Sequence, residues 1–473
     1  MVQRKRADRE YAGAGARLLP ADQHGRPGDG SVRRPQISGR TRAERRSEAC
    51  LRRPAETRRH ASLKILLLNQ TFYPDVASTA QYLSDVAVEL VRGGHDVTVV
   101  CSRRAYDNPS ERYPPRETWR GIEIRRISGW AFGKKARWRR AADFGSYLTS
   151  CVVHLARLPR FDLVVALTSP PLISWLGALF TRVKGGRFLF WVMDLNPDEA
   201  LAAGWLRPNS WTTKLLQGML RYSLNQAASV VVLDRFMAKR IVDKGMDPQR
   251  ITILPPWSQD HDVRYDPRGR QRFRKALGLQ EKHVVMYSGN HSPCHPLTTL
   301  LDAARRLKKR RDIAFCFVGG GSEFRTVRSF AEQHNLDSII TVPYQPLKEL
   351  SASLSAADLH VVVMGDAYVG IVHPCKVYNI RALGIPYLYI GPAQSHVQEL
   401  DPMFSARHGE VDAVVRHVQA AVAAGITGRA GFHGASDHGR DVLIAKMVTV
   451  FERAAASSSE RSVGAGDPAT THL

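Results

Sequence analysis

The chain lacks long hydrophobic runs and closely spaced cysteines. No stretch of about 20 consecutive apolar residues occurs, so no membrane-spanning helix is predicted. The first 62 residues contain no apolar core of a secretion signal. The six cysteines are scattered without a C-x-x-C pair: Cys50, Cys101, Cys151, Cys294, Cys316 and Cys375. This spacing argues against a zinc ribbon or a disulfide framework and is typical of a reducing cytoplasm.

Acidic residues are too few to balance the basic ones. The 473 residues include 68 Lys and Arg but 44 Asp and Glu, which gives a net charge of +24. Residues 1–62 hold 16 of the basic and 7 of the acidic side chains, are rich in Arg, Gly and Pro, and are predicted to be disordered, as is the tail 457–473. The basic remainder suggests a polyanionic partner, which could be nucleic acid, an anionic membrane or a phosphorylated substrate.

Between these ends, apolar strands alternate with amphipathic helices. The run Lys64–Leu68 predicts a buried strand, and a loop follows from Gln70 to Ser78. Apolar residues at helical spacing from Leu83 to Val91 then predict a helix that Gly93-Gly94 ends. No G-x-G-x-x-G follows, so a dinucleotide fingerprint is not supported. We therefore expect an α/β protein with two Rossmann-like domains, 63–257 and 283–436, a connector 258–282 and a last helix within 437–456.

Three strand-loop-helix junctions in the second half resemble phosphate-binding loops. They are the loop 288–296, the glycine run 319–321 and the stretch Gly365–Pro386. In the last of these, Pro374 suits a helix start and Gly384 a helix end, which predicts a helix over 374–383. Because a helix N-terminus attracts anions and Lys376 lies in the first turn, we expect a phosphorylated ligand there.

Other polar clusters leave several interpretations open. Asp194 follows the apolar strand of the first half that ends in Trp191 and Val192, and it could bind a sugar hydroxyl, accept a proton or cap the next turn. Asp260-His261-Asp262 is formally a D-x-D metal motif, but it lies in a charged linker, so no metal is expected. The basic residues from Lys134 to Arg140, beside Trp130 and Phe132, could contact an anionic bilayer, form a solvated helix face or bind nucleic acid.

Five motifs occur in the order found in GT-B glycosyltransferases of family 4, which the chain resembles from about 63 to 402. They are YPDVASTAQYLSDVAVELVRGGHDVTVV, WVMDLNPDEA, MYSGNHSPCHPLTTLLDA, FVGGGSEF and HPCKVYNIRALGIPYLYIG. The W-V-x-D-L-x-P and P-x-K-x-Y elements are similar to bacterial transferases of O-antigen, capsule and exopolysaccharide assembly. The resemblance implies two facing domains, with a nucleotide-sugar in the second and an acceptor in the first.

The resemblance also assigns roles to residues, and here the chain departs from the family. The diphosphate-binding Arg and Lys of the family fall on Asn290 and His295, and its two glutamates fall on Ile371 and Asn379. We expect Lys376 to restore positive charge beside the diphosphate. The candidate catalytic residues are Asp194, His295 and Lys376. The candidate donor-binding residues are Gly289, Asn290, Gly320, Gly321, Gln345, Gly370, Ile371 and Asn379. The candidate acceptor-side residues are Tyr73, Ser78, Thr79 and Asp198.

The expected function is retaining, metal-independent transfer of a sugar from a UDP- or GDP-linked donor to a saccharide or lipid-linked saccharide. No cofactor and no nucleic acid are expected, and the expected location is the cytoplasm or the inner face of the cell membrane. Two alternatives stay open. One is a sugar-nucleotide epimerase of the same fold, and the other is a catalytically inactive binding module.

Overall fold

The computed structural model describes residues 62–75, 77–105, 111–129, 137–258, 263–428 and 439–456, without the side chains of 137–144. The predicted disordered ends and the Asp260–Asp262 motif lie outside these residues. Of the basic cluster from Lys134 to Arg140, residues 134–136 also lie outside them, and for 137–140 the backbone alone is described. Within them, no helix is both long and apolar enough to cross a bilayer.

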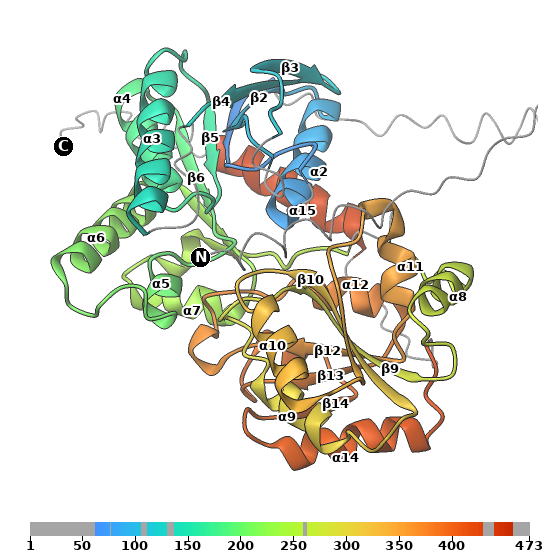
Figure 1. Ribbon diagram of the computed structural model, residues 1–473. Coiled ribbons are helices and arrows are strands. Elements are labelled where there is room, and N and C mark those ends of the chain that lie inside the picture. Colours follow the sequence, from blue (N-terminus) through green and yellow to red (C-terminus); the bar gives the residue numbers. More distant parts are fainter. Residues whose placement is uncertain are drawn as a thin grey trace, which may run out of the picture. The chain divides into compact units, whose positions relative to one another are not determined.

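The first half is an eight-stranded sheet with helices packed on it (Figure 1). Its strand order is β3-β4-β2-β1-β5-β6-β7-β8, parallel except for the pair β3 and β4. Its strands are β1 (Lys64–Leu68), β2 (Asp96–Ser102), β3 (Arg116–Trp119), β4 (Ile122–Ile127), β5 (Leu163–Ala166), β6 (Arg187–Trp191), β7 (Ser229–Val232) and β8 (Ile251–Ile253). Its helices are α2 (Ser78–Arg92), α3 (Arg137–Ala156), α4 (Ile173–Lys184), α5 (Asp198–Ala202), α6 (Trp211–Gln226) and α7 (Arg235–Asp243).

The second half is a six-stranded, fully parallel sheet in the order β11-β10-β9-β12-β13-β14. Its strands are β9 (His283–Asn290), β10 (Ile313–Gly320), β11 (Ile339–Val342), β12 (Leu359–Val363), β13 (Tyr387–Ile390) and β14 (Phe404–Ala406). Its helices are α8 (Pro267–Ala276), α9 (Thr298–Arg306), α10 (Phe324–His334), α11 (Leu350–Ser355), α12 (Lys376–Leu383), α13 (His396–Glu399) and α14 (Val411–Ala423). Short 3₁₀ turns span Pro248–Arg250, Leu347–Glu349 and Asp366–Tyr368.

The two Rossmann-like sheets predicted from the sequence are confirmed, and the differences are local. Helix α12 begins at Lys376 rather than at Pro374, and Gly384 ends it in the left-handed conformation with φ 67°. Strands β9 and β10 continue into the stretches predicted as loops, because Gly289 pairs with Gly319 in the ladder. The glycines there extend the sheet to its ligand-binding edge.

The last helix, α15 (Arg440–Ala456), packs against α2 and β6 of the first half (Figure 1). Met447 and Phe451 are fully buried in the core of that half, and the Phe451 ring meets Trp191 edge-on at 6.4 Å. Arg440 also pairs with Asp85 on α2. The helix predicted at the end of the chain therefore completes the first core rather than the second.

Removing the Phe451 ring should destabilise the first half. Truncation of a fully buried phenylalanine costs about 3–5 kcal/mol, so Phe451→Ala should lower the midpoint of urea unfolding. Val442 on the same helix is 52% exposed, and Val442→Ala should change stability by roughly 0.5 kcal/mol or less. Equal midpoints for the two variants would contradict this packing.

Candidate functional site

A cavity of about 400 Å³ is lined by residues that follow the carboxyl ends of strands in both sheets. This is the edge at which open α/β sheets bind ligands. The first half contributes Ser78, Thr79, Gln81, Tyr82, Met193, Asp194 and Glu199. The second half contributes residues 288–290, 292, 294–295, 318, 344–345, 350, 353–354, 372–376 and 379–380. Nine of the fifteen predicted site residues lie in this lining: Ser78, Thr79, Asp194, Gly289, Asn290, His295, Gln345, Lys376 and Asn379.

Lys376 places a buried cation at the N-terminus of α12. Its Nζ lies 3.8 Å from the centre of the Tyr287 ring and has no hydrogen-bond partner among the described residues. Burial lowers the pKa of Lys376 from 10.5 to about 7. Because the helix N-terminus beside it also carries partial positive charge, this corner of the cavity is electrostatically suited to an anion.

Gly289 makes room for this ammonium group. A Cβ atom at Gly289 would lie 3.1 Å from Lys376 Nζ, and the glycine has φ 129°, which other residues rarely adopt. A larger residue at position 289 would therefore push the lysine side chain away from Tyr287.

The histidines of the same loop add no positive charge. His295 Nδ1 lies 2.7 Å from the carbonyl of Val363, so it donates there and leaves Nε2 as an acceptor. Burial, and secondarily Lys376, lowers the pKa of His295 to about 3. Burial and Lys376 likewise lower the pKa of His291 to about 4. Lys376 is the one lysine or arginine in this cavity lining among the described residues.

The other glycines predicted to bind the donor contact their own chain instead. A Cβ at Gly321 would lie 2.3 Å from the carbonyl oxygen of His291, and one at Gly320 would lie 2.9 Å from the Tyr344 ring. Gly370 lies against the backbone of Phe236 at the start of α7, where a Cβ would come within 2.6 Å. None of these glycines lines the cavity in the described structure.

Ile371 is a core residue that joins the two halves. It is 3% exposed within the apolar core of the first half, and its carbonyl accepts a 2.8 Å hydrogen bond from the Leu195 N–H. The position where the family has a glutamate thus serves packing here and does not line the cavity. Asn379, at the second glutamate position, does line it.

Two carboxylates face the cavity from the first half. Burial, with the neighbouring Glu199, raises the pKa of Asp194 to about 7, and burial also raises the pKa of Glu199. Cys294 Sγ lies 3.7 Å from Glu199 Oε1. Asp198 instead forms a 2.8 Å ion pair with Lys244 and does not line the cavity. Glu199 was missed because the side of a five-residue helix that turns inward cannot be read from its sequence.

Of the remaining acceptor-side predictions, Ser78 and Thr79 line the cavity and Tyr73 does not. The hydroxyls of Thr79 and Thr71 lie 3.0 Å apart, and Ser78 lines the cavity beside Thr79. Tyr73 stacks on Trp119 with ring centres 4.1 Å apart and does not line the cavity. Tyr82, Ser292 and Cys294 line it without having been predicted, since nothing in their sequence context distinguishes them from loop and core residues.

A buried Asp-His-His cluster holds the loop before α12 against the first half. Asp234 caps α7 through the Met237 N–H and lies 2.7 Å from His373 Nδ1 and 3.4 Å from His396 Nδ1. Burial alone raises the pKa of Asp234, but the hydrogen bond and charge of His373 outweigh it and hold the value at about 2. The two imidazoles are stacked 3.6 Å apart at 12°, so their in-plane lone pairs do not converge on one metal position.

Two largely parallel Rossmann-like sheets with a cavity at their carboxyl edges are the architecture of the GT-B class. Residues 79–257 match the family described as glycosyl transferase 4-like domain, and residues 269–386 match glycosyl transferases group 1. The chain belongs to the group 1 glycosyltransferases of GT-B fold.

Individual relatives agree with this assignment. The chain is 24% identical to WcaI of Escherichia coli (strain K12), assigned to colanic acid biosynthesis as a glycosyl transferase, over 68% of this chain and 82% of that protein. It is 26% identical to WbjE of Pseudomonas aeruginosa, described as a glycosyltransferase, over 53% of this chain and 62% of WbjE. Anabaena HepE, solved with UDP-glucose, has the same fold, with a TM-score of 0.59 and 14% identity over 84% of this chain and all of HepE.

Lys376→Met should stabilise the free protein and weaken nucleoside diphosphate binding. Methionine keeps the apolar stem and removes a charge that is buried without a counter-ion, so the melting temperature should rise. Loss of a charged hydrogen bond to the diphosphate should weaken binding by roughly 10- to 100-fold in calorimetry. Because the pKa of free Lys376 is about 7, wild-type affinity should fall between pH 7.5 and 9. Lys376→Arg should remove that pH dependence, and a wild-type affinity constant over this range would contradict the assignment.

Asp234→Asn should destabilise the protein by about 2–3 kcal/mol at neutral pH. The folded pKa of Asp234 is depressed from 3.8 to about 2, so its contribution is present above pH 4 and is lost as the pH falls toward 2. Urea titrations should therefore show the wild type and the variant converging over that window. Asp337 is exposed on the second half, and Asp337→Asn serves as the control. A constant difference between pH 2 and 6 would exclude the charge of Asp234 as its cause.

Proposed function

We propose that the chain transfers a sugar, with retention of anomeric configuration and without a metal ion, from a nucleotide-sugar to a saccharide acceptor in cell-surface polysaccharide assembly. The observation that carries this proposal is the unpartnered, buried Nζ of Lys376 beside the N-terminus of α12. A departing nucleoside diphosphate develops negative charge at this point, and a preorganised cation stabilises it.

The donor side rests on residues of the second half. Lys376 and the N-terminus of α12 take the diphosphate, and Asn379, one turn further along α12, reaches the ribose. His295 Nε2 is left as an acceptor for a sugar hydroxyl. A UDP- or GDP-linked donor is supported by the fold shared with HepE, whose structure holds UDP-glucose, although that likeness itself is one of fold.

The acceptor side rests on Asp194 and Glu199 of the first half. The acceptor oxygen forms its bond to the anomeric carbon on the face from which the diphosphate leaves, and the departing phosphate oxygen takes the acceptor proton. Asp194, with a pKa near 7, orients the attacking hydroxyl by hydrogen bonding. This scheme requires no covalent nucleophile and no pair of glycosidase-type carboxylates.

The saccharide acceptor is proposed from the relatives. WcaI carries a description of colanic acid biosynthesis, and colanic acid is a polysaccharide. We propose a lipid-linked saccharide as acceptor, met at the inner face of the cell membrane.

An epimerase is the second candidate, because the cavity holds two carboxyl groups of raised pKa on one side and His295 on the other. Such a set could move a proton to and from a sugar carbon. Ile371, which replaces a family glutamate, weakens the sugar contacts of the transferase and keeps an inactive binding module as a third outcome.

Incubation with UDP- and GDP-sugars, with and without lipid-linked saccharides, separates these candidates. We expect acceptor-dependent release of nucleoside diphosphate, unchanged by EDTA, and retention in the product by NMR. An epimerised donor without acceptor would identify the epimerase, and tight diphosphate binding without turnover would identify the inactive module. An inverted product, or loss of turnover in EDTA that Mg²⁺ restores, would contradict the mechanism.

Asp194→Asn tests the acceptor side of the same reaction. Its kcat should fall by about 100-fold, because the attacking hydroxyl is no longer oriented, while the affinity for nucleoside diphosphate stays within a few-fold of the wild type. Asp337→Asn, on the exposed surface of the second half, should leave both quantities unchanged. A large loss of diphosphate affinity in Asp194→Asn would place this carboxylate on the donor instead.

A further inference from the structure

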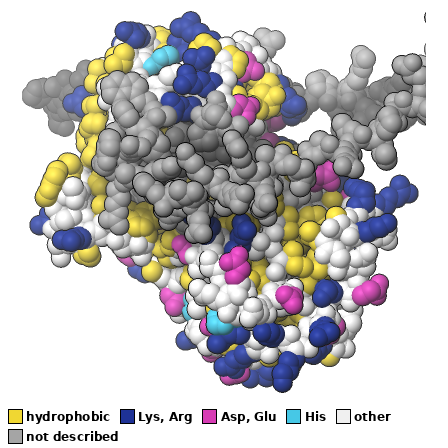
Figure 2. All heavy atoms as spheres, in the orientation of Figure 1, with side chains coloured by type: hydrophobic (Ala, Val, Ile, Leu, Met, Phe, Trp, Pro, Cys, Tyr) yellow, Lys and Arg dark blue, Asp and Glu magenta, His cyan; other side chains and the backbone are white. Residues whose placement is uncertain are grey.

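Helices α3, α4 and α6 of the first half carry an exposed apolar surface. Helix α4 packs against both α3 and α6. Seven of the large exposed apolar side chains of the described structure lie on these helices or on the loop before α6, and we call them the α3–α4–α6 surface: Val152, Val153, Leu179, Val183, Trp205, Trp211 and Leu215. Trp205 is 64% exposed and Trp211 is 74% exposed. Apolar side chains lie beside basic ones along this edge of the molecule in Figure 2.

Among the described side chains of α3, α4, α6 and the loop 203–210, the charged ones are basic. Between Gly145 and Leu233 the chain has eight Lys and Arg and four acidic residues. Asp162 accepts a hydrogen bond from the Lys64 N–H, and Asp198 is paired with Lys244. The other two, Asp194 and Glu199, line the cavity. Arg182, Lys184, Arg207, Lys214 and Arg221 are exposed among the apolar side chains.

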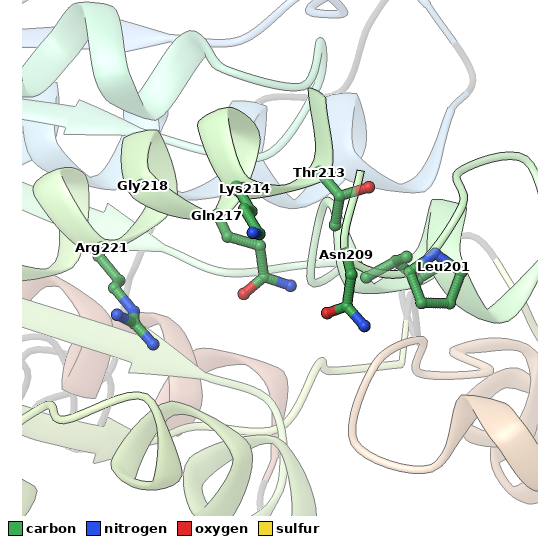
Figure 3. Close-up of a pocket in the computed structure, with 8 residues that line it drawn as sticks. Leu201, Asn209, Thr213, Lys214, Gln217, Gly218 and Arg221 are labelled. Atoms are coloured by element: carbon green, nitrogen blue, oxygen red, sulfur yellow. The ribbon is translucent and has the colours of Figure 1, made fainter. Parts of the chain in front are cut away.

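A separate pocket lies on α6 within this surface. Its volume is about 510 Å³, and Lys214, Gln217 and Arg221 lie along one side of the helix while Asn209 lies on the loop before it (Figure 3). Lysine and arginine at a spacing of seven residues share one helix face, two turns apart. The pocket thus offers cations and amide groups on the helix that also carries the exposed Trp211.

We propose that the α3–α4–α6 surface docks on an anionic phospholipid bilayer. Tryptophans belong at the boundary between headgroups and acyl chains, and exposed Lys and Arg without neighbouring acids are attracted to anionic headgroups. A protein partner would find an apolar surface that carries charge of one sign. Nucleic acid would gain little from Val152, Val153 and Val183. The bilayer interface accommodates both the exposed tryptophans and the exposed basic side chains of this surface.

This inference deepens the proposed function, since it would bring the lipid-linked acceptor to the cavity. Helix α5 connects the two places: Glu199 lines the cavity and Leu201 lines the pocket on α6. A helix with its side chains is about 10 Å across, so a headgroup held beside α6 lies roughly one helix diameter from the cavity.

Co-sedimentation of the full chain with vesicles tests the surface without any acceptor or donor. Vesicles of phosphatidylcholine alone are compared with vesicles containing about one third phosphatidylglycerol. We expect binding to the anionic vesicles. Trp205→Ser and Trp211→Ser should each weaken it by roughly tenfold. Lys214→Gln combined with Arg221→Gln should weaken it by at least roughly tenfold on anionic vesicles.

Val442→Ser combined with Lys446→Gln, on the exposed side of α15, is the matched control and should bind as the wild type does. Circular dichroism and melting temperature verify that every variant is folded.

No binding by the wild type would overturn the proposal. Unchanged binding by the surface variants would assign the membrane contact elsewhere in the chain. A dimer in sedimentation velocity that Trp211→Ser dissolves, without vesicle binding, would identify a second copy as the occupant. Failure of sugar transfer with intact vesicle binding would reject the proposed function alone.

Discussion

The structure around the cavity depends on one buried ammonium group that has no counter-ion among the described residues. Lys376 Nζ is removed from water by the Tyr287 ring and the strand glycine Gly289. Such burial is unfavourable, and it persists because the rest of α12 is firmly packed: Val377, Ile380 and Leu383 are buried. The stability of the helix thus holds a charge where it is unfavourable in the free protein. An anionic ligand relieves that cost, so binding and local stability are opposed at this residue.

Contacts from the first half hold the loop that leads into this helix. The Ile371 carbonyl accepts from the Leu195 N–H, and Asp234 binds His373 two residues later. Leu195 follows Asp194 directly, so the contact that holds the loop also lies next to the raised-pKa carboxylate. A shift of the loop before α12 would therefore move the cation and disturb the acid together. Ile371 contributes its carbonyl and its apolar packing to this contact, and its side chain does not line the cavity.

Much of the fold and part of the site could be predicted from the sequence. Asp194, Asn290, His295, Lys376 and Asn379 all follow strands of parallel sheets, and such residues meet at one edge. The glycines were less informative. A missing Cβ is needed both where a ligand approaches the backbone and where a neighbouring segment of the chain does. Gly321 is of the second kind, because a Cβ there would meet the carbonyl oxygen of His291. Tertiary contacts, which the sequence does not display, distinguish the two.

The distribution of charge connects the cavity with the outer surface of the first half. The acidic residues between Gly145 and Leu233 are buried, paired or turned into the cavity, while its exposed helices are basic and apolar. Burial and the neighbouring Glu199 raise the pKa of Asp194 to about 7, so Asp194 is partly protonated at neutral pH. In the proposed reaction this state limits its repulsion of a diphosphate beside Lys376. Exposed carboxylates on α4 or α6 would instead oppose an anionic surface. Among the described residues of this stretch, carboxylates therefore line the cavity or are paired, and none lies on α4 or α6, where the proposed anionic bilayer would dock.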